Sequence, residues 1–411
     1  MSSMALLLLL LVLAYIGSLW ASSERKRAFG SPSGIEYVLL GVLLGPEALG
    51  VLGHQAISAF EPIALVALGW IGVLYGLECG MNGNRRAPLG RIVLGLVLTI
   101  VTASLAAAAA WWMIGFTRLA EGDLQLMMSA AIGLVTAETT RHAVRWIGER
   151  QTLSSPLAEL LQDLSAADDA PVLLALALLF AQLSGEHALH DRTLPALAMA
   201  GVTVGSGVLL GCVSAWLIGK SHSPVERWTV LLGAAWLATG MTKSLGLSAL
   251  AATFAFGLTL SVLSRDAERL RQQVGPTEGA VLLPALLLAG AHVRWPASQA
   301  EVALVALAIA VRFATSFVFG VGLSFTRRDT RGLGPWLGVG MLASGTLTMI
   351  VAFGISMRCP AEIARPALAI AFVGTLLGEL IGPTALRRAF GRSSAPPPAR
   401  PEDELALEQP Q

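Results

Sequence analysis

Asp168 and Asp169 are adjacent carboxylates inside a long apolar stretch of the chain. A helix that enters a membrane near Leu157 carries Asp168 roughly 17 Å inward, near the middle of a hydrocarbon core about 30 Å thick. Ionisable residues at this depth are costly to bury and are functional hypotheses by default. The pair therefore predicts a site that binds or carries a charged species.

Arg312 lies at a matching depth in a second apolar stretch that begins near Glu301. An Asp–Arg pair would offset the desolvation of both partners. Adjacent aspartates point about 100° apart on a helix, so one can pair with Arg312 while the other faces water. That other carboxylate is expected to titrate near neutral pH and to bind either a proton or a cation. This competition is the minimal chemistry of a cation/proton antiporter; a fixed ion-pair cluster without transport is the alternative.

Two hydroxyl-rich segments fall at the same depth, VTAETT at 135–140 and ASGTLT at 343–348. Broken helices in transporters use such segments, whose freed carbonyls and hydroxyls contact ions. We expect Thr136, Glu138 and Thr139 from the first segment to line the site, with Thr136 and Glu138 touching the ion. Ser344 and Thr346 line it from the second. The alternative is that the hydroxyls bond back to intact helices.

The composition places these residues in a membrane protein. Of 411 residues, 55% are hydrophobic and 13% are charged, whereas roughly a quarter of the residues in soluble domains are charged. The apolar runs do not alternate as barrel strands do, so the fold is expected to be an all-α polytopic bundle of about 13 transmembrane helices. The expected helices cover residues 4–20, 36–53, 60–80, 91–115, 124–147, 157–183, 194–218, 226–243, 246–263, 277–293, 301–325, 333–357 and 365–388.

Charge distribution predicts the orientation of these helices. With the N-terminus outside, 21 of the 28 Lys and Arg residues fall on the cytoplasmic side, as the positive-inside rule requires. Six helices, a linker helix and six more give two halves of opposite orientation, with a site where they meet. We expect a transmembrane domain over 1–390 and a disordered cytoplasmic tail over 391–411, which is rich in Pro and Glu. Asp163, about 9 Å inside the membrane, is expected to line the inner vestibule.

Several classes of protein and site are excluded. A net charge of +1 and the lack of a basic patch argue against nucleic acid as a partner. Cys79, Cys212 and Cys359 are scattered and suggest neither a disulfide framework nor a metal site. We expect no catalytic residues, no cofactor and no metal beyond a transported monovalent cation.

Four motifs resemble the monovalent cation:proton antiporter superfamily when taken in order. Residues 41–50 read GVLLGPEALG and residues 72–78 read GVLYGLE. The helix that carries Asp168 and Asp169 is similar to the Asp-Asp helix of sodium/proton members, and residues 245–258, from LGLSAL to FGL, complete the series. The resemblance covers about 35–390.

This resemblance implies roles for the site residues. The second aspartate of the pair, Asp169, would carry the ion and the proton, and Asp168 would pair with Arg312. The two crossing helices would be broken at the hydroxyl-rich segments. Core helices, about 60–183 and 277–388, would slide against a scaffold made of the remaining helices, and two chains would form a homodimer in the inner or plasma membrane.

Arg312 stands where many Asp-Asp members have lysine. Lysine can lose its proton during a transport cycle, whereas arginine effectively cannot, so we expect electroneutral sodium/proton exchange that serves pH homeostasis. The alternatives are a potassium/proton antiporter, a sodium-coupled organic anion symporter of related fold and a sensor without transport. An intramembrane aspartyl protease is disfavoured because no second span supplies a facing aspartate.

Overall fold

The computed structural model describes residues 34–79, 81–82, 85–86, 88–137, 160–161, 163–164, 167, 169–184, 196–221, 223–264, 266–326, 338 and 345–393. Nearly all of these residues are helical. The helices are α2 (Ile35–Leu44), α3 (His54–Ala59), α4 (Glu61–Glu78), α5 (Leu89–Thr117), α6 (Gly122–Ala137), α9 (Asp169–Ser184), α10 (Ala196–Lys220), α11 (Pro224–Leu245), α12 (Ala249–Leu263), α13 (Ala267–Val274), α14 (Thr277–Ala291), α15 (Gln299–Thr326), α17 (Thr346–Ser356) and α18 (Ala361–Ser393). One small hairpin, β1 (Met81–Asn82) with β2 (Arg85–Arg86), follows α4. An all-α fold is therefore confirmed apart from these two-residue strands.

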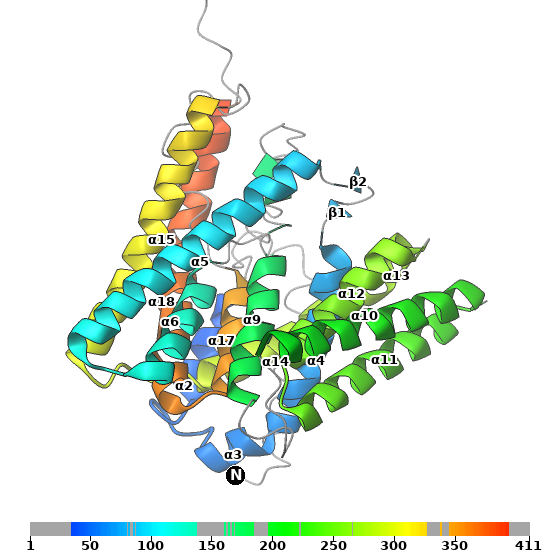
Figure 1. The fold of residues 1–411 in the computed structure, drawn as a ribbon, viewed down its shortest axis with the longest axis horizontal. Helices are drawn as coiled ribbons and strands as arrows, with labels where there is room; N and C mark the ends of the chain where they lie inside the picture. Colours follow the sequence, from blue (N-terminus) through cyan, green and yellow to red (C-terminus); the bar gives the residue numbers. More distant parts are fainter. Residues whose placement is uncertain are drawn as a thin grey trace, which may run out of the picture.

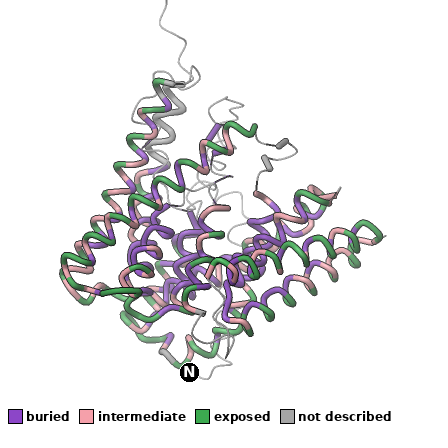
Figure 2. Tube along the Cα trace, in the orientation of Figure 1, coloured by how far each residue is buried: buried purple, intermediate pink, exposed green. Residues whose placement is uncertain are grey.

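The short apolar helices α6, α9 and α17 lie at the centre of the molecule, and the long helices α5, α15 and α18 lie on one side of them (Figure 1). The pair α10 and α11 lies on the opposite side. Buried residues concentrate in the central helices, while α10, α11 and α15 alternate between buried and exposed residues (Figure 2). The largest apolar cluster among the described residues joins α2, α4, α6, α9, α14, α17 and α18, and smaller clusters lie around α10, α11 and α12.

Glycines allow the tightest helix packing. Gly72 and Gly76 of α4 lie against the backbone of α12, and Gly257 of α12 lies against the backbone of α4. A Cβ atom at any of the three would overlap its neighbour. Small residues let membrane helices approach this closely. The glycines in two of the four family-like motifs are thus explained by packing.

Five described helices are long and apolar enough to cross a membrane, namely Glu61–Glu78, Leu89–Thr117, Ala196–Lys220, Gln299–Leu323 and Ala361–Gly382. A sixth span is possible if α13 and α14, which meet at a 54° bend, count as one. Shorter apolar helices, α2, α6, α9, α12 and α17, make up the rest of the core. The chain is thus a multi-pass helical membrane protein, and the count of thirteen spans stays a prediction.

Two predicted helix boundaries were wrong. The helix expected over 36–53 ends at Leu44, because Gly45 is extended and Pro46 follows it. The segment before the expected helix 277–293 holds an additional helix, α13. Its polar sequence concealed it, but Leu270 and Val274, one turn apart, are buried against α4 and α12. Pro276 stands at the bend between α13 and α14.

Helix α17 begins inside the molecule. Gly345 is extended and Thr346 is the first helical residue, so no helix runs unbroken through Gly345. With 11 residues, α17 is about 16 Å long, roughly half the thickness of a bilayer core. The corresponding segment of α6 is described as far as Ala137.

Candidate functional site

Asp169 is the first residue of α9 and is fully buried. Both carboxylate oxygens are shielded from solvent. The described residues that precede it, 160–161, 163–164 and 167, are helical as well. An ionised carboxylate in such a place is expensive to desolvate, and a bound proton or cation offsets that cost. Asp169 is therefore a buried carboxylate whose negative charge must be offset inside the protein.

Arg312 of α15 reaches the last described turn of α6. Its side chain is 4% exposed, and its Nη1 donates a hydrogen bond of 2.6 Å to the carbonyl oxygen of Thr136. The Thr136 hydroxyl donates to the carbonyl oxygen of Ile132 at 2.6 Å, one turn earlier. The contact joins α15 to the last described turn of α6. Arg312 thus places a positive charge beside the α6 backbone at Thr136.

Thr346 lies at the start of α17 and is 2% exposed. Its hydroxyl forms a hydrogen bond of 2.8 Å with the Tyr75 hydroxyl of α4. The first amide groups of a helix have no intrahelical partner and carry partial positive charge. The bond to Tyr75 fixes the position of this helix start relative to α4.

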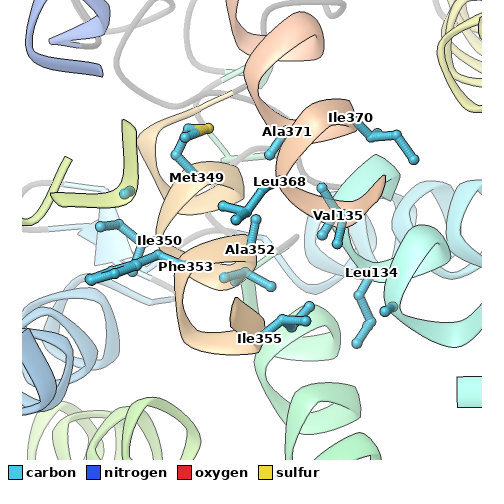
Figure 3. Close-up of a cluster of buried hydrophobic side chains, with 14 of the residues drawn as sticks. Leu134, Val135, Met349, Ile350, Ala352, Phe353, Ile355, Leu368, Ile370 and Ala371 are labelled. Carbon is cyan, nitrogen blue, oxygen red and sulfur yellow. The ribbon is translucent and has the colours of Figure 1, made fainter. Parts of the chain in front are cut away.

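Helices α6, α9 and α17 contact one another. Beside them, apolar side chains of α6 (Leu134, Val135), α17 (Met349, Ala352) and α18 (Leu368) pack closely, as Figure 3 shows. The structure thus brings together α9, which carries Asp169, the described part of α6 and the short helix α17. Water is excluded from the apolar side of this junction.

The structure describes only some of the predicted site residues. Asp169, Thr136, Thr346 and Arg312 are placed as above. The remaining four, Asp168, Glu138, Thr139 and Ser344, lie outside the described residues. The predicted pair of Asp168 with Arg312 therefore stays a prediction.

Two polar contacts near the site were not foreseen. Tyr75 was noted only as part of a motif, although it is the hydroxyl-bearing residue in a run of apolar and glycine residues, 62–77. Asp163 was expected to line the inner vestibule, but the structure places it away from solvent. It is fully buried, and its Oδ2 accepts a hydrogen bond of 2.7 Å from Nη1 of Arg91, whose side chain is 16% exposed. The depth of Asp163 in the membrane, which is all that the sequence gives, could not show that Arg91 of α5 is its partner.

Buried charges, discontinuous helices and apolar spans are the features of a membrane transport protein. The family model described as the transmembrane region of sodium/hydrogen exchangers matches residues 8–387. The chain belongs to this sodium/hydrogen exchanger family of cation/proton antiporters, as its motifs predicted, and it is a transporter rather than an enzyme.

Solved structures show the same fold. The sodium proton antiporter MjNhaP1 from Methanocaldococcus jannaschii at pH 8 is 16% identical, with a TM-score of 0.63 over 96% of this chain and 99% of that one. An electron-microscopy structure of MjNhaP1 is 17% identical, with a TM-score of 0.61 over 97% of this chain and 100% of that one. No curated protein matches the sequence.

Proposed function

We propose that this protein is a secondary active antiporter that exchanges a monovalent cation, sodium first, for a proton at Asp169. One observation carries the proposal: the fully buried carboxylate of Asp169 lies on a helix, α9, that contacts both α6 and α17, and α17 begins inside the molecule at Thr346. A proton and a cation can each neutralise this carboxylate, and a site that holds one at a time couples their movements.

The other predicted residues complete this site. Thr136, Glu138, Thr139, Ser344 and Thr346 would supply oxygen atoms around the cation, and Asp168 would share the charge of Arg312. The chain would span the inner or plasma membrane with its N-terminus outside and its C-terminus in the cytoplasm, in the 6+1+6 arrangement of inverted repeats. Core helices, about 60–183 and 277–388, would move against a scaffold of remaining helices in a homodimer.

Dequenching of a pH-sensitive dye in everted vesicles tests the assignment, with sodium, potassium and lithium added in turn. We expect a sodium-dependent signal from the wild type and none from Asp169→Asn, which keeps the shape of the side chain but cannot ionise. Asp123→Asn is the matched control, because Asp123 is an exposed aspartate in the first turn of α6. A potassium signal in place of sodium would make the protein a potassium/proton antiporter. An active Asp169→Asn would refute the role of Asp169.

We further propose that exchange is electroneutral. Arg312 is buried, donates to Thr136 and keeps its proton at every accessible pH. One cation and one proton then alternate on one carboxylate, and no net charge crosses the membrane. In proteoliposomes, the rate of sodium/proton exchange is expected to be the same with and without an imposed membrane potential. A rate that follows the potential would show unequal stoichiometry.

A further inference from the structure

Helix α18 presents one continuous buried face, and the helix packs against α6 and α17. Leu368, Ala371 and Thr375 recur at intervals of three and four residues, and each is at most 2% exposed. Leu368 and Ala371 lie beside Met349 of α17 and Val135 of α6 (Figure 3). This face is apolar at its contact with the two short helices, and it becomes polar at Thr375.

The register places Thr375 beyond both helix ends. α17 and α18 are joined by the short turn 357–360, so they run antiparallel, and positions after Ala371 on α18 face positions before Met349 on α17. Thr375 is about 6 Å beyond Ala371 along the helix axis, whereas Thr346 is only about 4.5 Å before Met349. Thr375 therefore lies at the level where α17 has not yet begun.

The hydroxyl of Thr375 differs from those of other buried threonines. Thr203, Thr239 and Thr253 each donate to the carbonyl oxygen four residues earlier, at 2.8 to 2.9 Å. Thr375 is 1% exposed, and its Oγ1 has no hydrogen-bond partner among the residues that the structure describes. A buried hydroxyl without a partner loses the hydrogen bonds that it made in water. A buried hydroxyl oxygen without a hydrogen bond is suited to reversible binding of a ligand.

Glu379 lies one turn beyond Thr375 on α18, and its Oε1 is shielded from solvent. Residues four apart on a helix are neighbours, with Cβ atoms about 6 Å apart. A hydroxyl and a carboxylate are hard oxygen ligands, which suit alkali cations rather than anions. A carboxylate inside a membrane helix is itself a functional hypothesis.

We propose that Thr375 and Glu379 form a second cation site on α18, which the transported monovalent cation occupies between Asp169 and the cytoplasmic side. The proposal rests on the proposed antiport function and adds a step to it. Thr375 contributes a neutral oxygen atom and Glu379 contributes the charge. Asp169 remains the residue that exchanges the proton.

The apparent KM for sodium in everted vesicles tests this site. Thr375→Val removes the hydroxyl and keeps the shape, and the loss of one oxygen ligand is expected to raise KM about fivefold. Glu379→Gln removes the charge and is expected to raise KM about tenfold or more, because interactions with charged groups are stronger. Thr375→Ser restores an oxygen atom and is expected to return KM to within about twofold of the wild type.

Thr203→Val is the matched control. Thr203 is equally buried, but its hydroxyl bonds back within α10, so this variant is expected to keep the wild-type KM. Wild-type KM values in both Thr375→Val and Glu379→Gln, with Asp169→Asn inactive, would overturn the second site and leave antiport intact. An elevated KM that Thr375→Ser does not restore would also overturn it, as an effect of packing alone. A wild type silent to every cation would overturn both proposals.

Discussion

Arg312 acts on the backbone of the site. Its guanidinium donates to the carbonyl oxygen of Thr136, which is the penultimate described residue of α6. Arginine keeps its charge at every accessible pH, so this hydrogen bond does not depend on the protonation state of nearby carboxylates. Under the proposed function, Asp169 can then gain and lose a proton while the contact between α15 and α6 is kept.

Cys359 shows what burial does to a titratable group outside the membrane spans. It lies in the turn between α17 and α18, and burial raises the pKa of its thiol to about 12, although Arg358 opposes the shift. The thiolate is the reactive form. In a Cys79→Ser/Cys212→Ser variant, we expect Cys359 not to react with a thiol reagent at pH 8 until the protein is denatured.

The same shift has a consequence for stability. The folded pKa lies above the ordinary value of 9.0, so the neutral thiol contributes stability below pH 9, and this contribution is lost as the pH rises through 12. A Cys79→Ser/Cys359→Ser variant, which keeps the exposed Cys212, is the control for access of the reagent. Rapid labelling of Cys359 in the folded protein at pH 8 would show that this turn opens.

At the scale of elements, the ion pair between Asp163 and Arg91 joins the segment before α9 to the first turn of α5. Gly95, one turn after Arg91, lets α5 lie directly against the carbonyl oxygen of Leu164. Asp163, which forms the ion pair, lies six residues before Asp169 in the sequence. The ion pair therefore helps to set the position of the helix that carries Asp169.

Breaking this pair is expected to be costly. Asp163→Asn leaves the charge of Arg91 uncompensated, and the loss of a buried partner costs about 3 kcal/mol of unfolding free energy. The double variant Arg91→Gln/Asp163→Asn is expected to lose less unfolding free energy than the two single variants lose together. Thermal melting of the purified protein measures each loss.

Glu301 and Arg365 provide a comparison, because they pair at 3.3 Å between α15 and α18 with side chains 12% and 26% exposed. Glu301→Gln is expected to cost less than about 1 kcal/mol, since partial solvation weakens an ion pair. Equal melting temperatures for Asp163→Asn and the wild type would contradict a structural role for the Arg91 pair.

Helix positions could be predicted from the sequence where apolar runs are long, as for α4, α5, α10 and α15, because hydropathy alone defines such spans. Helices in polar or interrupted segments were harder to predict from the sequence. Leu44 ends a helix because of the glycine and proline after it, and α13 depends on two buried residues in a polar segment. Within the site, Asp169 and Arg312 were found by depth, whereas Tyr75 and the Asp163 pair depend on contacts between distant segments.

At the scale of the whole molecule, the helices fall into two groups according to how many of their apolar residues are buried. The central helices bury most of their residues, whereas α10 and α11 expose large side chains such as Trp216 and Trp236. Lipid or a second copy of the chain can cover such a surface. The division does not follow the proposed domains helix by helix, because the buried helix α12 belongs to the proposed scaffold and the exposed helix α5 to the proposed core, so the movement of a core against a scaffold stays a proposal.

The central claim is that a cation and a proton compete for Asp169, and proton release measures this directly. Sodium is added to purified protein in weakly buffered detergent solution, and the protons released are counted for the wild type and for Asp169→Asn. We predict release of about one proton per wild-type chain at a pH where Asp169 is protonated, and none from the variant, since binding and titration are linked. Equal release from both proteins, or transport by a wild type that releases no proton, would contradict the account.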